Sequence, residues 1–410
     1  MKIVLATCGS RGDVQPMIAT SLALKAAGHD VLLIGPPEKA MWARQLRCPY
    51  MEFGQDVTAF LNQVENSNSL RSNLEFNSFV RREIDVQFKV LPRIIKNADL
   101  AIGSSLMGGL SSISEAMKIK YQYIVFTPQL IPSNFHPFIA VKTQTLPKWC
   151  NKLSWGIAKL LDKFNLTFLI NQNRKRMHLE PLSNAWDHII GDNTIVACDS
   201  QVAKVPLDVK PNFIQTGYPH LDLPGKPLPE LDRFLKTGTR PIYAGFGSMP
   251  PKEQRRNIPL LVDAARSLGK RIIISKFWKE DSEYQFDKDV FFIKNYPHLK
   301  LFPETDAIIH HGGAGTTATA AVSGVPQVII PHILDQYFHG HQIYLSNLGS
   351  KPVWRTRLTA EKLTSALKTA LFSKAVKLNS KTARSQIDKT RSLKLMVKAV
   401  EQSGFQSGTI

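Results

Sequence analysis

The stretch from Ile308 to Pro326 holds the residue types and spacing best suited to chemistry. It reads IIHHGGAGTTATAAVSGVP, so an apolar strand runs into glycines, then threonines, then a helix that starts without bulky side chains. Glycines let backbone N–H groups approach an anion, and the free N–H groups and dipole of a helix N-terminus favour phosphate. The hydroxyls of Thr316 and Thr317 add donors, and His311 can add a proton or a positive charge. The stretch predicts a phosphate-binding turn, with a glycine turn kept only for close packing as the alternative.

A metal site is not expected around this turn. Neighbouring residues on a strand point to opposite faces, which separates His310 from His311, and no carboxylate-rich partner follows. The Asp-x-Asp triplet at 287–289 lies in the polar run 279–289 and is expected to be a solvated turn. A helix end contributes roughly 0.3–2 kcal/mol and a charge-assisted hydrogen bond roughly 1.5–3 kcal/mol. Several such contacts make a metal-independent anion site feasible.

Two series of alternating strands and helices are expected to position these residues. Apolar runs predict strands at 3–7, 30–35, 100–104, 121–127 and 194–198, then at 242–246, 271–275, 290–293, 307–310 and 327–330. The spacing within 14–27 predicts a helix, and strand–helix–strand units of this length are parallel and nearly always right-handed. The predicted fold is therefore α/β, with two facing Rossmann-like, doubly wound parallel-sheet domains and an interdomain cleft. Ligands of such sheets bind outside the carboxyl ends of the strands.

A proline-rich segment divides the two series. Residues 218–229 hold four prolines and one glycine, which suppress helix and ladder bonding. We place the first domain at 1–218, the linker and expected hinge at 219–238, the second domain at 239–385 and a C-terminal helix at 386–410. The helical spacing of apolar residues extends over 360–402.

Three motifs carry a resemblance to a known family. The run HHGGAGTT, followed by Gly324-Val-Pro326 and Pro331-His-Ile-Leu-Asp-Gln336, resembles the donor-binding signature of the family 1 nucleotide-sugar glycosyltransferases with the GT-B fold. The segment Gly9-Ser-Arg-Gly-Asp-Val-Gln-Pro16 resembles the branch that holds sterol glucosyltransferases and bacterial enzymes that glycosylate antibiotic aglycones. Gly245-Phe-Gly-Ser248 fits the family's first carboxy-domain turn. The last helix of this fold generally returns to the first domain, as we expect of 386–410.

The resemblance implies a role for each matching residue. Asp13 takes the position of the catalytic base, and His311 would contact the donor phosphates. Asp335 and Gln336 match the pair that holds the sugar hydroxyls. The other donor-binding residues implied in this way are Ser10, Arg11, Gly12, Ser248, His298, Gly313, Ala314, Gly315, Thr316 and Thr317.

Some of these residues have simpler alternatives. Asp13 and Asp335 can each be the N-cap of the helix that follows, because aspartate is favoured there. Arg11 can pair with phosphate or simply be solvated. A carboxylate with a pKa near 3.9 is a weak base for an alcohol, so the catalytic role of Asp13 requires partial desolvation to raise its pKa.

The implied reaction is inverting transfer of a sugar from a nucleoside diphosphate to a hydroxyl of a sterol, lipid or natural-product aglycone, without cofactor or metal. Plant members stack a tryptophan on uracil within Trp-x-Pro-Gln, whereas this chain has Asn295-Tyr-Pro-His298. The base is therefore uridine or thymidine, and UDP-glucose is the donor that the resemblance favours. The alternatives are a nucleotide-sugar-binding protein and another enzyme of the same fold, such as an epimerase.

The acceptor is not specified by the sequence. The apolar residues of 57–90, and those of 132–141, either line an acceptor pocket or form the buried faces of ordinary helices. Both interpretations stay open at this stage.

Composition narrows the class of protein. Hydrophobic residues make up 43% and charged residues 21%, as in globular domains. Four scattered cysteines exclude a disulfide scaffold and suit a reducing cytosol. No apolar run approaches the roughly 18 residues of a membrane span, so we expect a soluble, cytoplasmic protein.

The net charge is +19, and residues 351–410 hold 13 Lys or Arg against 3 Asp or Glu. This basic tail is either a solvated helix face or a contact with an anionic membrane surface. Nucleic acid is not an expected partner, because no recognition motif accompanies the charge.

Overall fold

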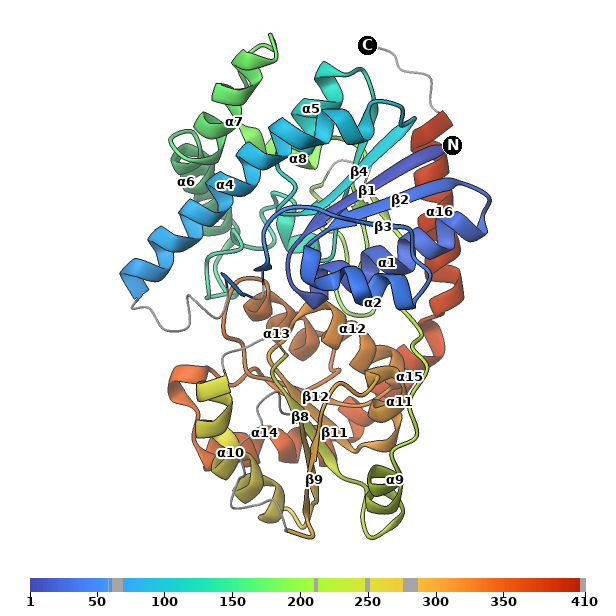
Figure 1. Cartoon of the computed structure of the whole chain (residues 1–410). Helices are drawn as coiled ribbons and strands as arrows, with labels where there is room; N and C mark the ends of the chain where they lie inside the picture. The colour runs from blue at the N-terminus through green and yellow to red at the C-terminus, as the bar shows by residue number, and fades with distance from the viewer. Residues whose placement is uncertain (58, 61–68, 210–212, 248–250, 276–286, 406–410) are drawn as a thin grey trace.

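Two parallel β-sheets, each flanked by helices, form the two halves of the molecule (Figure 1). The structure is a computed structural model, and it describes all residues except 58, 61–68, 210–212, 248–250, 276–286 and 406–410. The seven-stranded sheet has the order β3-β2-β1-β4-β5-β6-β7, and the five-stranded sheet the order β10-β9-β8-β11-β12. Every pair of neighbouring strands is parallel. The predicted fold class is confirmed.

The strands of the first sheet are β1 (Lys2–Cys8), β2 (Asp30–Gly35), β3 (Tyr50–Glu52), β4 (Leu100–Ser105), β5 (Lys120–Val125), β6 (Ile195–Val196) and β7 (Ile214–Gln215). Those of the second are β8 (Ile242–Gly245), β9 (Ile272–Ser275), β10 (Val290–Ile293), β11 (Ala307–His310) and β12 (Gln327–Ile329). Sequence analysis missed β3 and β7. Both are short edge strands whose residues are exposed or half-buried, so neither shows an apolar run.

The helices of the first half are α1 (Arg11–Ala26), α2 (Ala40–Gln45), α4 (Ser69–Ile95), α5 (Leu110–Ala116), α6 (Lys148–Asp162), α7 (Leu166–Arg176) and α8 (Ala185–Ile190). Those that follow are α9 (Pro229–Lys236), α10 (Pro251–Arg266), α11 (His298–Leu301), α12 (Ala314–Ser323), α13 (Gln336–Leu345), α14 (Ala360–Phe372), α15 (Lys374–Gln386) and α16 (Lys389–Phe405). None of the helices that the structure describes is both long enough and apolar enough to span a membrane.

The predicted linker is only partly extended. Helix α9 begins at Pro229, where the first helical position tolerates a missing N–H, and its Leu231 packs with Tyr243 and Ile273 in the second half. The predicted tail helix is divided into α14, α15 and α16. Ser373 is the C-cap of α14 and also the N-cap of α15. Its side chain accepts a hydrogen bond from the N–H of Val376 in α15.

Helix α16 packs on the first half, although it follows the second half in the chain (Figure 1). Its Met396, Ala399 and Val400 belong to the same buried cluster as Ile3 and Met17. Polar contacts at the helix end add to this packing: Glu401 lies 3.1 Å from His29, and Lys120 donates to the carbonyl of Gly404 at 2.6 Å. The chain therefore crosses between the halves twice.

This packing predicts that Met396→Ala lowers the free energy of unfolding by about 2–5 kcal/mol, because the fully buried side chain leaves a cavity. Urea unfolding of the full chain measures the change. Lys398→Ala is the matched control. Lys398 lies two residues further along the same helix and is exposed, so we expect its replacement to have little effect. Equal stability of the two variants would show that α16 is not part of the first core.

Candidate active site

The two motifs singled out by sequence lie at corresponding places in the two sheets. The loop 9–13 joins β1 to α1, and β1 is the strand where the order of the first sheet reverses, next to β4. The turn 311–313 joins β11 to α12, and β11 lies next to β8 at the reversal of the second sheet. Crevices that bind ligands form at the carboxyl ends of strands at such reversals. In Figure 1, α12 and α13 lie on the side of the second half that faces the first.

The Asp13 carboxylate is held by three hydrogen bonds. Its Oδ2 accepts from the Ser10 N–H at 2.8 Å and from the Ser10 hydroxyl at 3.2 Å. Its Oδ1 accepts from the Ser105 hydroxyl at 2.7 Å. Gly9 permits this arrangement, because a Cβ at that position would overlap the Asp13 carboxylate.

Burial raises the pKa of Asp13, and the hydrogen bonds from Ser105 and Ser10 partly offset that effect. Partial desolvation of a carboxylate strengthens it as a base toward a hydroxyl proton. Oδ1 accepts one hydrogen bond here, and a carboxylate oxygen has two lone-pair positions. The environment that the catalytic interpretation of Asp13 requires is therefore present.

The alternative N-cap interpretation of Asp13 is wrong in detail. Helix α1 begins at Arg11, three residues before the expected start, and its N-cap is Ser10. Asp13 occupies the third helical position of a capping box, where its side chain accepts from the N-cap N–H. The same carboxylate thus closes the first turn of the helix and stays partly exposed.

Arg11 is half-buried and is not simply solvated. Its guanidinium sits 5.1 Å from the ring centre of Trp42, and its Nε donates to Gln15 at 3.2 Å. Burial lowers its pKa, while Tyr243 of the second half acts in the opposite direction. Arg11 therefore approaches the second domain. Gly12 is exposed beside it.

The turn before α12 leaves helix N–H groups without a side-chain cap. Gly313 is the N-cap residue and has no side chain, so the first-turn N–H groups of Ala314, Gly315 and Thr316 lack an intrahelical partner. His311 lies against this turn: a Cβ on Gly313 would come within 2.5 Å of its Nε2. The His311 Nδ1 is buried and has no hydrogen-bond partner among the described residues. Free N–H donors and an unpaired imidazole are suited to an anion.

His311 is neutral in this environment. Burial lowers its pKa to about 3, and the neighbouring histidines 310, 332 and 339 act in the same direction. Of the two contributions that the sequence left open for His311, a proton or a positive charge, this environment favours the proton. A neutral imidazole still offers one N–H donor.

Several predicted donor-binding side chains already have partners within the protein. The Thr317 hydroxyl donates to the carbonyl of Gly313 at 3.0 Å, inside its own helix. The Gln336 Oε1 accepts from the N–H groups of His332 and Ile333 at 2.8 and 3.1 Å. His298 bonds to the Tyr243 hydroxyl at 3.0 Å and stacks on Phe302. Ser248 lies outside the described residues.

Asp335 occupies the N-cap position of α13 but makes no side-chain cap hydrogen bond. Its Oδ2 lies 3.5 Å from the Nδ1 of His339, one turn along the helix. Burial raises the pKa of Asp335, and the charge of Asp13 raises it further. The capping alternative for Asp335 therefore finds no supporting hydrogen bond.

The two motifs face each other across the halves of the molecule. Helices α1 and α12 are in contact, and the carboxylates of Asp13 and Asp335 are close enough to interact electrostatically. Tyr218 also bridges the gap, since a Cβ on Gly315 would lie 2.7 Å from its hydroxyl. The structure thus brings the helix of Asp13 together with the helix that follows the turn 311–313.

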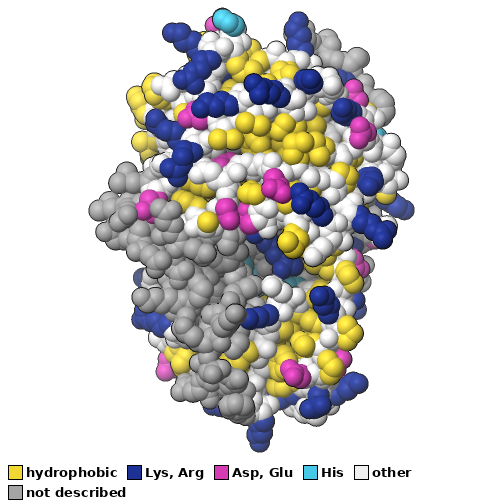
Figure 2. Space-filling model, in the orientation of Figure 1, with side chains coloured by type: hydrophobic (Ala, Val, Ile, Leu, Met, Phe, Trp, Pro, Cys, Tyr) yellow, Lys and Arg dark blue, Asp and Glu magenta, His cyan; other side chains and the backbone are white. Residues whose placement is uncertain are grey.

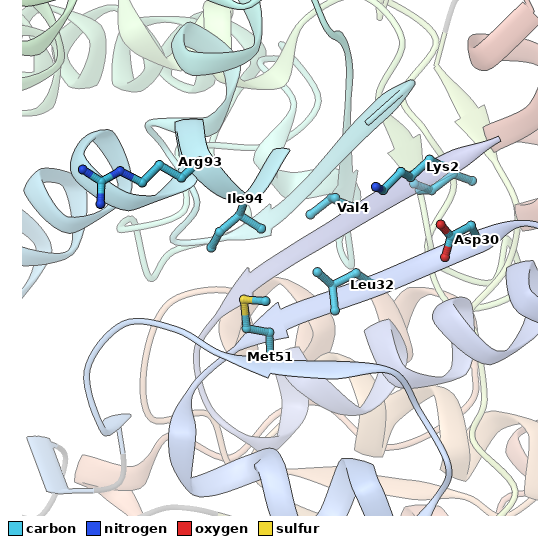
Figure 3. Close-up of a pocket in the computed structure, with 8 residues that line it drawn as sticks. Lys2, Val4, Asp30, Leu32, Met51, Arg93 and Ile94 are labelled. Carbon is cyan, nitrogen blue, oxygen red and sulfur yellow. The ribbon is translucent and has the colours of Figure 1, made fainter. Parts of the chain in front are cut away.

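A hollow of about 290 Å³ on the first sheet lies elsewhere (Figure 3). Lys2 and Asp30, at the amino ends of β1 and β2, line it together with Val4, Leu32 and Met51. Asp13 and the donor turn follow the carboxyl ends of their strands, so this hollow is separate from the candidate site.

Sequence analysis missed the residues that position the site. Ser105 orients Asp13, Tyr243 holds His298, and Tyr218 approaches the donor helix. Ser105 follows a predicted strand, which is the one signal that pointed to it. The backbone of Ser105 is left-handed, at φ 55°, and its carbonyl accepts from the Tyr123 hydroxyl at 2.5 Å.

Comparisons with known proteins agree with this geometry. Residues 3–132 match the glycosyltransferase family 28 N-terminal domain, and residues 260–394 match the C-terminal domain of the erythromycin biosynthesis protein CIII-like family. The chain belongs to the GT-B glycosyltransferases.

Relatives span both halves of this glycosyltransferase. It is 29% identical to the vancomycin aglycone glucosyltransferase of Amycolatopsis orientalis over 385 residues, with 90% of each chain covered. It is 29% identical to a sterol 3-beta-glucosyltransferase of Arabidopsis thaliana over 401 residues, which are 93% of this chain and 62% of the relative. Spinosyn forosaminyltransferase has a similar structure, with a TM-score of 0.69, 16% identity and 98% of each chain covered.

The variant Asp13→Asn tests the proposed role of Asp13 as the catalytic base. The amide oxygen can still accept from the Ser10 N–H, so α1 keeps its cap, while the ability to take a proton is lost. We expect the kcat of glycosyl transfer to fall by roughly 10²–10⁴-fold, with thermal stability retained. Transfer at nearly the original rate would remove Asp13 from the mechanism.

Ser105→Ala tests the positioning of Asp13. The Ser105 hydroxyl stabilises the charged carboxylate and lowers the pKa of Asp13, so its removal raises that pKa further. The base is active when deprotonated, and activity is lost as pH falls through its pKa. We therefore expect the acid limb of the kcat/KM–pH profile to move to higher pH in Ser105→Ala. Ser104→Ala is the neighbouring control, because the Ser104 hydroxyl bonds to Thr7 instead. An unmoved acid limb would contradict the role of Ser105.

Proposed function

We propose that this glycosyltransferase moves a hexose from a nucleoside diphosphate sugar to a hydroxyl of a lipophilic acceptor, with inversion at the anomeric carbon. The observation that carries the proposal is the contact between the helix of Asp13, whose half-buried carboxylate has a raised pKa, and an uncapped helix N-terminus in the other half. The names of the relatives favour an aglycone or a sterol as acceptor and glucose as the sugar.

The proposed chemistry uses the two halves separately. Asp13 takes the proton of the acceptor hydroxyl as its oxygen attacks the anomeric carbon, and the bond from that carbon to the diphosphate oxygen breaks. The acceptor oxygen would approach the anomeric carbon from the side of Asp13, while the diphosphate would leave on the opposite side, toward α12. Displacement in this geometry inverts the anomeric configuration. Asp335 makes no side-chain cap hydrogen bond and interacts electrostatically with Asp13, and we assign it to the sugar hydroxyls.

The leaving diphosphate is assigned to the α12 turn. Its negative charge would be met by the N–H groups of 314–316, the helix dipole and the unpaired Nδ1 of His311. The Asp-x-Asp triplet has another use, because Asp287 pairs with Arg266 and accepts from the N–H of Asp289. We therefore propose that transfer does not depend on a divalent metal.

We propose UDP-glucose as the donor. Asn295, at the position of the family's base-stacking tryptophan, is exposed and adopts a left-handed backbone at φ 44°. One structural neighbour, the glycosyltransferase VinC, was solved with dTDP, at a TM-score of 0.67, 16% identity and coverage of 98% of this chain and 100% of its own. Thymidine nucleotides are therefore the informative competitor.

The test incubates the full chain with UDP-glucose or dTDP-glucose and a panel of sterols and aglycones, with product mass and anomeric configuration as readouts. We expect a glucoside of inverted configuration from at least one lipophilic acceptor, with unchanged rate in excess EDTA. Donor binding without any product would indicate a nucleotide-sugar-binding protein. A retained configuration, or activity lost with EDTA and restored by Mg²⁺, would overturn the mechanism.

A further inference from the structure

Large apolar side chains are exposed along helix α6 and the start of α7 in the first half. On α6 they are Trp149, Leu153, Ile157, Leu160 and Leu161, and Phe164 and Phe168 continue the surface, which we call the α6–α7 apolar face. Each of these seven side chains is at least 50% exposed, and Phe164 is 80% exposed. A contiguous apolar surface of this kind marks a site of interaction.

The exposure follows the period of the helix. At about 100° per residue, the five apolar residues of α6 fall within an arc of about 120°. The side of α6 that is buried carries Asn151 and Trp155, which donate to the carbonyls of Asn134 and His136 at 3.0 and 3.2 Å. A surface helix normally buries its apolar stripe, whereas α6 is anchored by other residues and presents that stripe outward.

Basic residues border the same face. Lys148 and Lys152 lie together along one flank of the stripe by the same helical spacing, and Lys163 follows at the helix end. Lys159, on the same flank, pairs with Asp187 at 2.7 Å. Residues 148–176 contain a single acidic residue, Asp162, which accepts from the Thr167 hydroxyl. In Figure 2, hydrophobic and basic side chains lie side by side at the upper left, where Figure 1 places α4 in front of α6 and α7.

We propose that the α6–α7 apolar face docks on an anionic lipid bilayer. The apolar stripe, with Trp149 and Phe164 among its members, would enter the boundary between headgroups and acyl chains, while the lysines contact anionic headgroups. A helix that lies in a membrane interface combines an apolar face, aromatic residues and lysines in this way.

A chain of contacts links α6 to helix α13 of the second half. Trp155, on the buried side of α6, packs edge-on against His136, whose ring contacts Phe338 of α13 at 5.5 Å between centroids. Helix α13 begins at Gln336, directly after Asp335. The consequence that a lipophilic acceptor is taken up from the docked bilayer rests on the proposed function, whereas docking itself does not.

The basic tail is a poorer candidate for this contact. The apolar residues of α16 are used inside the molecule, where Met396 and Val400 pack in the first core. Its exposed Lys394 and Lys398 therefore supply charge without an apolar stripe. Of the two alternatives that the sequence left open for the tail, the solvated helix face is therefore favoured, and we assign the membrane contact to α6 and α7.

The test is co-sedimentation of the full chain with vesicles of phosphatidylcholine alone or mixed with an equal amount of phosphatidylglycerol. We expect binding to the mixed vesicles that weakens with salt and falls at least about tenfold in the double variant Leu161→Ser/Phe164→Ser. The matched control is Leu378→Ser/Phe372→Ser, since these residues are 65% and 61% exposed in the second half. A second pair compares Lys152→Glu/Lys163→Glu with Lys394→Glu/Lys398→Glu, of which we expect the first alone to reduce binding.

Several outcomes would overturn docking at this face. These are no binding to mixed vesicles, equal losses in the test and control pairs, or a dimer of the full chain that Leu161→Ser/Phe164→Ser dissociates. Glucosylation of a detergent-dispersed sterol separates this proposal from the proposed function. Transfer without vesicle binding defeats docking alone, and vesicle binding without transfer to any acceptor defeats the proposed function alone.

Discussion

The position of the Asp13 carboxylate is the constraint on which the rest of the candidate site depends. Burial opposes its ionised form, while hydrogen bonds from Ser10 and Ser105 support that form. The net effect is a raised pKa, which makes this carboxylate a stronger base than one in water. Gly9 is part of the same constraint, because only the absence of a Cβ lets the carboxylate reach the Ser10 N–H.

Helices α1 and α12, which are in contact, begin differently, and the difference suits the role that we propose for each. The first turn of α1 is closed by its own capping box, so its dipole acts on a carboxylate that belongs to the chain. The first turn of α12 starts at a glycine and has no such partner, which leaves its donors for an external anion. The same secondary-structure element is thus suited to the proposed base on one side and to the proposed anion site on the other.

Apolar surface is also used differently by two amphipathic helices outside the sheets, α16 and α6. Helix α16 buries its apolar residues in the first core and ties the end of the chain to that half. Helix α6 is fixed through Asn151 and Trp155 and leaves its apolar residues exposed. Stability accounts for the first arrangement, whereas the second indicates contact with something outside the chain.

Sequence alone determined the fold class, the strands of four residues or more, and the two loops that carry the candidate site. These features are local: apolar periodicity, glycines before a helix and an aspartate in the first turn are visible in a single stretch of chain. The tertiary structure decided which side chains remain available. Thr317 and Gln336 turned out to have partners within the protein, His311 is neutral through burial, and Ser105 reaches Asp13 from 92 residues away. Such properties depend on contacts between distant segments, and the exposure of α6 depends on what the remainder of the chain leaves uncovered.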